Sequence, residues 1–194
     1  SGQTDPDPVV AEVPVTTCSE TLSTFDAYPL VYLGDTFEGL PIKYCKRRQT
    51  AGIPGFNPPT DSFVFVYGDC TVKPGRSSCN YPLVVIVYPR CDPPFVDASV
   101  RTDIVRGSPV KVSRERSMLV ITPQYRVKVS PGIRDAAGES LVSRALLQLR
   151  GANALAANLT VGKPLADPAL VRAPAVDRDA CEDADTLKSV AEPT

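Results

Sequence analysis

The sequence predicts an α+β fold: a mainly antiparallel sheet with one long helix packed on it, stabilised by disulfides. Residues 63–67 and 83–88 are apolar on both faces, which is typical of strands at the centre of a sheet. Three further strand segments follow, and a helical segment comes after them. Strands that precede a helix, without regular alternation between the two, favour α+β architecture over a wound parallel sheet.

The chain of 194 residues is long enough to bury a sizeable core, and its composition indicates one domain with tails. Residues 1–17 are rich in proline and predict an extended linker, with an edge strand as the alternative. Residues 18–164 are expected to form the α+β domain. Residues 165–194 predict a tail with a short helix, tethered to the domain through Cys181.

Strand signals run through the first two thirds of the domain. Residues 28–33 predict a strand, and residues 37–41 a turn that leads to a second extended segment. Residues 109–112, 118–121 and 125–129 are separated by short polar turns and predict an antiparallel meander. In the last of these strands apolar and basic residues alternate, so we expect one face of that part of the sheet to meet water.

The helical segment has signals at both ends. Asp135 is a good N-cap, and Gly151 follows Arg150, where we expect the helix to stop. An apolar stripe at the helical period, which we expect to cover the sheet, comprises Val142, Ala145, Leu146 and Leu149. A short second helix is expected within residues 152–158.

Six cysteines form an even set, and their spacing predicts disulfides. They are Cys18, Cys45, Cys70, Cys79, Cys91 and Cys181. A four-cysteine zinc site normally uses pairs that are close in sequence, and a redox site uses C-x-x-C; neither pattern occurs. The Pro74-Gly75 turn signal favours a bond between Cys70 and Cys79. For the others, we propose Cys18 with Cys45 and Cys91 with Cys181, among several connectivities that the sequence allows.

The chain contains no histidine and has a net charge of −1. The lack of histidine excludes catalytic triads that need imidazole and zinc sites that include it. The balanced charge argues against nucleic-acid binding. We therefore expect no metal and no cofactor, and a non-enzymatic role is favoured over catalysis.

Two patterns that resemble catalytic or metal sites have simpler interpretations. Ser108 and Lys111 fit S-x-x-K, but on a strand residues three apart point to opposite faces. An acidic cluster in the tail could bind calcium, yet its order does not fit an EF-hand, and a solvated segment is the favoured interpretation. The cluster comprises Asp177, Asp179, Glu182, Asp183 and Asp185.

The proline-rich loop over residues 52–60 is the candidate recognition surface. It carries Ile53 and Phe56, two apolar side chains that could contact a partner protein. The competing interpretation is that Phe56 packs onto the core, as large apolar side chains usually do.

Three short motifs support an exported location. Residues 37–41, residues 65–70 with Cys79, and residues 89–91 resemble segments of uncharacterised secreted or membrane-anchored proteins of high-GC Gram-positive bacteria. The resemblance covers residues 28–150. Those proteins tend to carry a glycine pair before the second cysteine, where this chain has Ser77-Ser78. The resemblance implies export but no activity.

The expected function is that of an exported, disulfide-braced binding or structural module at the cell surface, whose partner is a protein or cell-envelope component. One alternative is an extracytoplasmic hydrolase that uses carboxylates or a serine. Another is a subunit of a larger envelope assembly. No apolar stretch is long enough to cross a bilayer, and a lipid anchor upstream of Ser1 is left open.

Overall fold

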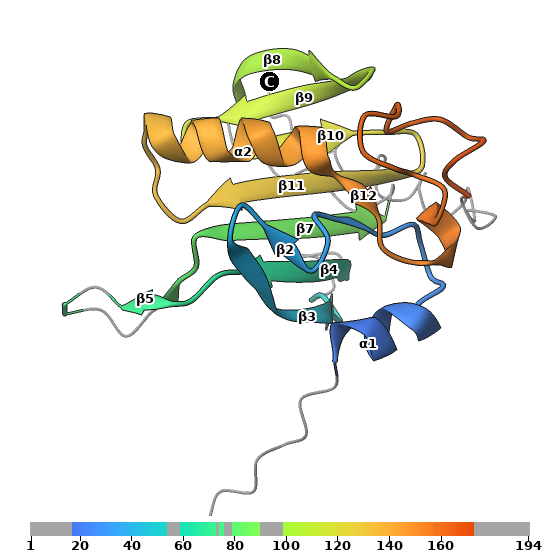
Figure 1. Ribbon diagram of the computed structural model, residues 1–194, viewed down its shortest axis with the longest axis horizontal. Helices are drawn as coiled ribbons and strands as arrows, with labels where there is room; N and C mark the ends of the chain where they lie inside the picture. The colour runs from blue at the N-terminus through green and yellow to red at the C-terminus, as the bar shows by residue number, and fades with distance from the viewer. Residues whose placement is uncertain (1–16, 54–58, 73, 76–78, 90–98, 173–194) are drawn as a thin grey trace, which may run out of the picture.

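An eight-stranded antiparallel sheet forms the body of the protein (Figure 1). The computed structural model describes residues 17–53, 59–72, 74–75, 79–89 and 99–172. Across the sheet the strands are β2 (Thr36–Phe37), β3 (Leu40–Thr50), β4 (Thr60–Tyr67), β7 (Leu83–Pro89), β11 (Tyr125–Pro131), β10 (Met118–Ile121), β9 (Ser108–Ser113) and β8 (Ser99–Val105). The expected linker over residues 1–17, apart from its last residue, and the expected tail helix lie outside the described residues.

Smaller elements surround this sheet. Strand β1 (Val31–Tyr32) pairs with β12 (Arg150–Gly151), and β5 (Thr71–Val72) pairs with β6 (Cys79–Asn80). The helices are α1 (Cys18–Thr24), α2 (Ala136–Gln148) and a 3₁₀ turn over Ala154–Ala156. In Figure 1, α2 lies across one face of the sheet over β10 and β11, and α1 lies beside β3.

The core lies between the sheet and the elements that pack on it, which are α2, the segment over 22–37 and the segment over 149–171. The predicted stripe is confirmed for Val142, Ala145 and Leu146 of α2, which are buried, and Leu149 is buried as the C-cap residue just after the helix. The predicted meander of β9, β10 and β11 is also confirmed. In β11 every second residue from Tyr125 to Pro131 is buried and the residues between them are half-buried, so the alternation seen in the sequence is the alternation of the two sheet faces.

Helix α2 begins where the sequence predicts. Asp135 Oδ1 accepts the backbone N–H of Gly138 at 2.9 Å and so caps the first turn. The expectation of one long helix is wrong: α2 has 13 residues and ends at Gln148. The reason is tertiary, since the backbone of the next residues leaves the helix to pair with β1 as β12. A Cβ on Gly151 would lie 1.6 Å from the Ala156 carbonyl oxygen, so this pairing requires glycine there.

Three other elements differ from expectation. Only Val31–Tyr32 of the segment 28–33 is strand. Helix α1 and strand β8 were not predicted from the sequence. Strand β8 lies at the end of the sheet and is mostly exposed, so it carries no apolar alternation that a sequence pattern could detect.

Candidate functional site

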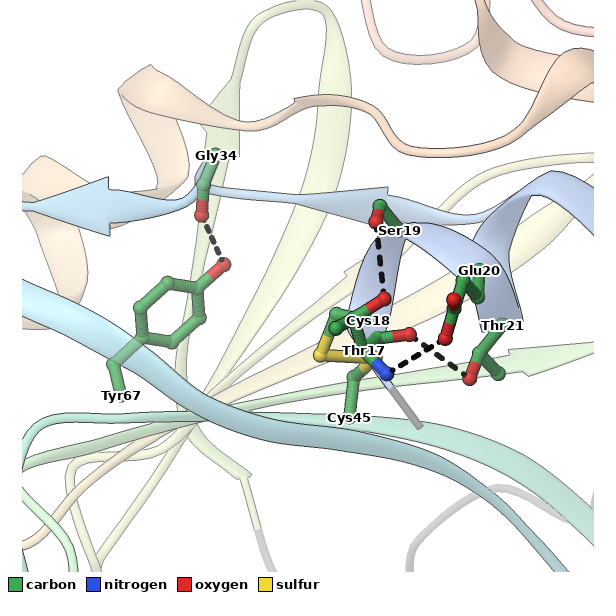
Figure 2. The surroundings of a disulfide bond; sticks show 8 residues. All are labelled: Thr17, Cys18, Ser19, Glu20, Thr21, Gly34, Cys45 and Tyr67. Carbon is green, nitrogen blue, oxygen red and sulfur yellow. Dashed lines mark hydrogen bonds between the residues drawn. A yellow bond between two sulfur atoms is a disulfide. The ribbon is translucent and has the colours of Figure 1, made fainter. Parts of the chain in front are cut away.

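Both described cysteine pairs form disulfides, as predicted. Cys18 is bonded to Cys45 and Cys70 to Cys79. The first bond fixes the start of α1 to β3 (Figure 2), where the Thr17 N–H also donates to Glu20 Oε2 at 3.2 Å. The proposed bond between Cys91 and Cys181 lies outside the described residues. These cysteines therefore brace the fold and do not form a reactive site.

The candidate site is an open pocket between the β1–β2 segment and the last turns of α2, which we call the α2 pocket. Its volume is about 440 Å³. Its floor is apolar and includes the buried Leu33 and Phe37, while Leu147 contributes an exposed apolar side chain (52% exposed) at the rim. The lining residues are Leu33, Thr36, Phe37, Glu38, Arg144, Leu147, Gln148 and Arg150.

An ion pair closes one side of the α2 pocket. Glu38 and Gly39 form the two-residue turn between β2 and β3, with positive φ values of 47° and 79°. This turn brings Glu38 onto α2, where Arg144 Nε and Nη2 donate to its two carboxylate oxygens at 2.7 and 2.9 Å. Hydrogen bonding to Arg144 holds the pKa of Glu38 below its usual value. The Glu38 carboxylate is therefore ionised and engaged at neutral pH.

Arg150 supplies the other charge of the α2 pocket. It lies opposite Tyr32 in the β1–β12 pair, with its guanidinium against the backbone of Gly34. Within the described ranges its side chain has no hydrogen-bond or ion-pair partner. Burial and the nearby Asp35 carboxylate raise the pKa of Tyr32, and Arg150 partly offsets them. Arg150 is thus a cation at the pocket rim with donors available to a ligand.

Tyr67 holds the wall of the α2 pocket in place. Its hydroxyl accepts the backbone N–H of Leu33 at 3.0 Å and donates to the carbonyl oxygen of Gly34 at 3.1 Å (Figure 2). The side chain is completely buried, and this burial raises its pKa. The backbone on which the guanidinium of Arg150 rests is therefore fixed from the core side.

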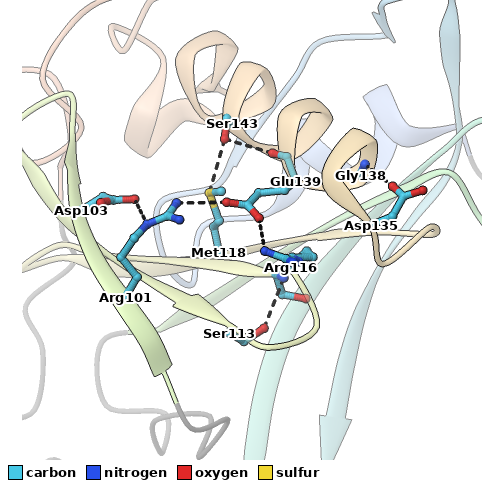
Figure 3. Close-up of polar contacts among 10 residues, drawn as sticks. Arg101, Asp103, Ser113, Arg116, Met118, Asp135, Gly138, Glu139 and Ser143 are labelled. Atoms are coloured by element: carbon cyan, nitrogen blue, oxygen red, sulfur yellow. Dashed lines mark hydrogen bonds and ion pairs between the residues drawn. The ribbon is translucent and has the colours of Figure 1, made fainter.

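A second charged cluster has a structural role (Figure 3). Glu139, in the first turn of α2, pairs with Arg101 of β8 at 3.1 Å and with Arg116 of the β9–β10 turn. Hydrogen bonds, first from Arg101 and then from Arg116, lower the pKa of Glu139. These contacts fix the start of α2 to the neighbouring strands and leave the carboxylate fully engaged.

The residues singled out from the sequence do not converge on one site. Ser108 is buried (1% exposed) and Lys111 is exposed, so they lie on opposite faces of β9, as the spacing predicts. Ile53 is 58% exposed, whereas Phe56 and the acidic cluster of the tail lie outside the described residues. The described ranges contain no group of three or more potential ligands that could hold a metal ion.

Sequence reasoning missed the α2 pocket. Arg144, Leu147 and Gln148 lie outside the apolar stripe of α2, and their spacing places them close together on the helix surface. This cluster on the helix surface could have indicated the α2 side of the pocket from the sequence. The lining residues within 33–38 could not be predicted as partners of this cluster, because they are more than a hundred positions away in the sequence.

Comparisons with known proteins do not assign a family: no family model, curated protein or solved structure matches the chain. In the part of the chain that the structure describes, every helix is too short or too polar to cross a membrane. The function is therefore argued from the geometry of the α2 pocket.

Proposed function

We propose that this protein is an exported binding module at the cell surface, and that the α2 pocket binds a ligand with an anionic group next to an apolar part. The observation that carries the proposal is the guanidinium of Arg150. It stands beside an apolar floor without a partner among the described residues. A guanidinium presents two parallel N–H donors to a carboxylate or phosphate, and the hydrogen bonds are charge-assisted.

Two further observations support an extracytoplasmic binding role. Disulfides such as Cys18–Cys45 form and persist in oxidising compartments, in agreement with the secreted proteins that the sequence resembles. Ile53 is exposed, as a recognition loop requires, and its contact with a partner stays a prediction.

Binding fits the α2 pocket better than hydrolysis does. Hydrolysis by paired carboxylates needs one carboxylic acid with a raised pKa. The lining of the α2 pocket includes a single carboxylate, that of Glu38, and its pKa is lowered. The alternative nucleophile, Ser108, is buried away from Lys111 and does not line the pocket.

The test is a titration of ¹⁵N-labelled protein with benzoate, which combines a carboxylate with an apolar ring. We expect chemical-shift changes at the backbone amides of the lining residues. We expect none with benzyl alcohol, which is neutral, or benzamidine, which is cationic. Arg150→Gln should weaken benzoate binding by about tenfold or more, because a hydrogen bond to a charged group contributes roughly 1.5–3 kcal/mol.

Arg114→Gln is the matched control. Arg114 is exposed on the turn between β9 and β10, and it also has no partner in the described ranges. Benzoate binding that survives Arg150→Gln, or that Arg114→Gln weakens equally, would contradict the assignment. So would benzoate shifts that do not involve the lining residues, or no shift at all.

A further inference from the structure

Strand β8 is the last strand of the eight-stranded sheet. It has seven residues and pairs on one side with β9 (Figure 1). On its other side it has no strand partner among the residues that the structure describes. Such an edge offers backbone N–H and C=O groups to another strand.

The turn between β8 and β9 determines which residues of β8 point outward. Arg106 and Gly107 have φ values of 49° and 77°, which is the pattern of a two-residue type I′ turn. The residues that flank such a turn, Val105 and Ser108, form a hydrogen-bonded pair. Because hydrogen-bonded pairs alternate along an antiparallel ladder, the backbone N–H and C=O groups of Arg101 and Asp103 form hydrogen bonds with β9. The backbone groups of Thr102 and Ile104 therefore point to the free edge.

The sequence of this edge complements itself. Residues 100–104 read V-R-T-D-I. When two copies align antiparallel about Thr102, Val100 faces Ile104 and Arg101 faces Asp103. The two apolar side chains are 57% and 69% exposed, so pairing with a second copy would remove apolar surface from water. Cross-strand pairs of opposite charge and of apolar side chains both stabilise a sheet.

We propose that two copies of this protein associate through β8, antiparallel about Thr102, and form one continuous sheet across the dimer. Thr102 would then pair with its own symmetry mate in a hydrogen-bonded position, which is the isologous arrangement of a two-fold dimer. Arg101 and Asp103 of different copies would fall in the non-hydrogen-bonded pairs, where side chains approach most closely. The proposal does not depend on the α2 pocket.

Two features limit the strength of this dimer. Ser99 and Arg101 pair with the consecutive residues Ser113 and Val112 of β9, so Val100 is the extra residue of a β-bulge and the regular alternation of β8 ends at Arg101. Arg101 also has partners in its own chain, Asp103 at 2.8 Å and Glu139 at 3.1 Å, and the second copy has to compete with them. We therefore expect a monomer–dimer equilibrium that depends on concentration and weakens with added salt.

The first test is analytical ultracentrifugation of the full chain over a concentration series, for the wild type, Thr102→Pro and Thr102→Val. Proline removes the outward N–H of Thr102 and leaves the inward ladder to β9 intact. We expect the wild type and Thr102→Val to dimerise and Thr102→Pro to stay monomeric. Circular dichroism and thermal unfolding check that the proline variant is folded.

The second test exchanges charges. Asp103→Arg gives an edge with two arginines, and Arg101→Asp gives an edge with two aspartates, so each variant alone should be monomeric. Their equimolar mixture should form a heterodimer, because every charged pair is then complementary. The double variant Arg101→Asp/Asp103→Arg should dimerise with itself.

A wild type that is monomeric at every concentration would overturn the proposal. Dimerisation of Thr102→Pro as strong as that of the wild type would also overturn it, because the association would then use another surface. If Arg101→Asp does not fold, since it places a carboxylate next to Glu139, the pair of Thr102 variants still decides.

Discussion

The side-chain oxygen of Asn153 accepts the backbone N–H of Leu30 at 2.9 Å, across 123 positions of sequence. The Asn153 Nδ2 donates to the carbonyl oxygens of Phe25 at 3.1 Å and Tyr28 at 2.9 Å. One buried amide thus satisfies three backbone groups of the segment that leads into β1. This segment leads through β1 to Leu33, which lines the α2 pocket. The amide of Asn153 therefore connects the wall of the pocket to the chain that follows α2.

Asn153→Ala should lower the free energy of unfolding by about 3 kcal/mol, because it leaves buried backbone groups without partners. Urea denaturation measures this loss. Asn158→Ala is the control, since Asn158 is exposed a few residues away, and we expect a change within about 0.5 kcal/mol. Equal effects of the two substitutions would show that the hydrogen bonds of Asn153 do not stabilise the fold.

Tyr67→Phe should destabilise the protein by about 1–3 kcal/mol. The ring remains, but the buried N–H of Leu33 and carbonyl of Gly34 lose their shared partner. Tyr44→Phe serves as the control, because the Tyr44 ring packs against Tyr81 at the surface and its hydroxyl has no hydrogen bond in the described ranges. A stability unchanged by Tyr67→Phe would indicate that water replaces the hydroxyl.

Alkaline pH should destabilise the protein. Burial raises the pKa of both Tyr67 and Tyr125 in the folded state, whereas an unfolded tyrosine ionises near its ordinary pKa of about 10. Below that pH the two hydroxyls are protonated in both the folded and the unfolded state, and the free energy of unfolding keeps its full value. As pH rises through about 10 and beyond, the unfolded state loses its protons first, so the free energy of unfolding falls.

Denaturation curves across this pH range check the prediction, together with tyrosinate absorbance of the folded protein. The double variant Tyr67→Phe/Tyr125→Phe should flatten the alkaline slope, because it removes both buried phenol groups. A slope that the double variant leaves unchanged would assign the alkaline loss to other groups.

The two described disulfides should contribute unequally to the free energy of unfolding. Cys18→Ser/Cys45→Ser should lower the free energy of unfolding by about 3–4 kcal/mol on the chain-entropy model, because this bond closes the longer loop and fixes α1 to the core. Cys70→Ser/Cys79→Ser should cost about 2–3 kcal/mol at most, since its loop is short and exposed at β5 and β6. Thermal unfolding compares the two variants, and a larger loss for the second pair would contradict this ranking.

The sequence was most informative where the signal is local. The apolar runs of β4 and β7 and the alternation of β9 to β11 identified interior strands, because burial on one or both faces demands such patterns. Asp135 marked the start of α2, because a cap acts within one turn. Strand β8 escaped detection because an exposed edge strand has no such requirement.

The structural roles of several charged residues could not be predicted from the sequence. Arg106 donates to the carbonyl oxygens of Leu149, Thr160 and Lys163, and so holds the end of α2 against the β8–β9 turn. Glu38 and Arg144 pair across 106 positions of sequence. In the sequence each of these residues is an ordinary surface charge, because nothing local specifies its partner.

The sequence by itself determined the class of the fold, its central strands, the start and apolar face of α2, and the pairing of Cys70 with Cys79 across a short loop. It also excluded imidazole chemistry, because the chain has no histidine. Only the tertiary structure decided the order of the strands, the early end of α2, the α2 pocket and the place of β8 at the end of the sheet. Local propensity and periodicity act between near neighbours, whereas a pocket and a sheet edge are fixed by contacts between distant segments that form when the core is buried.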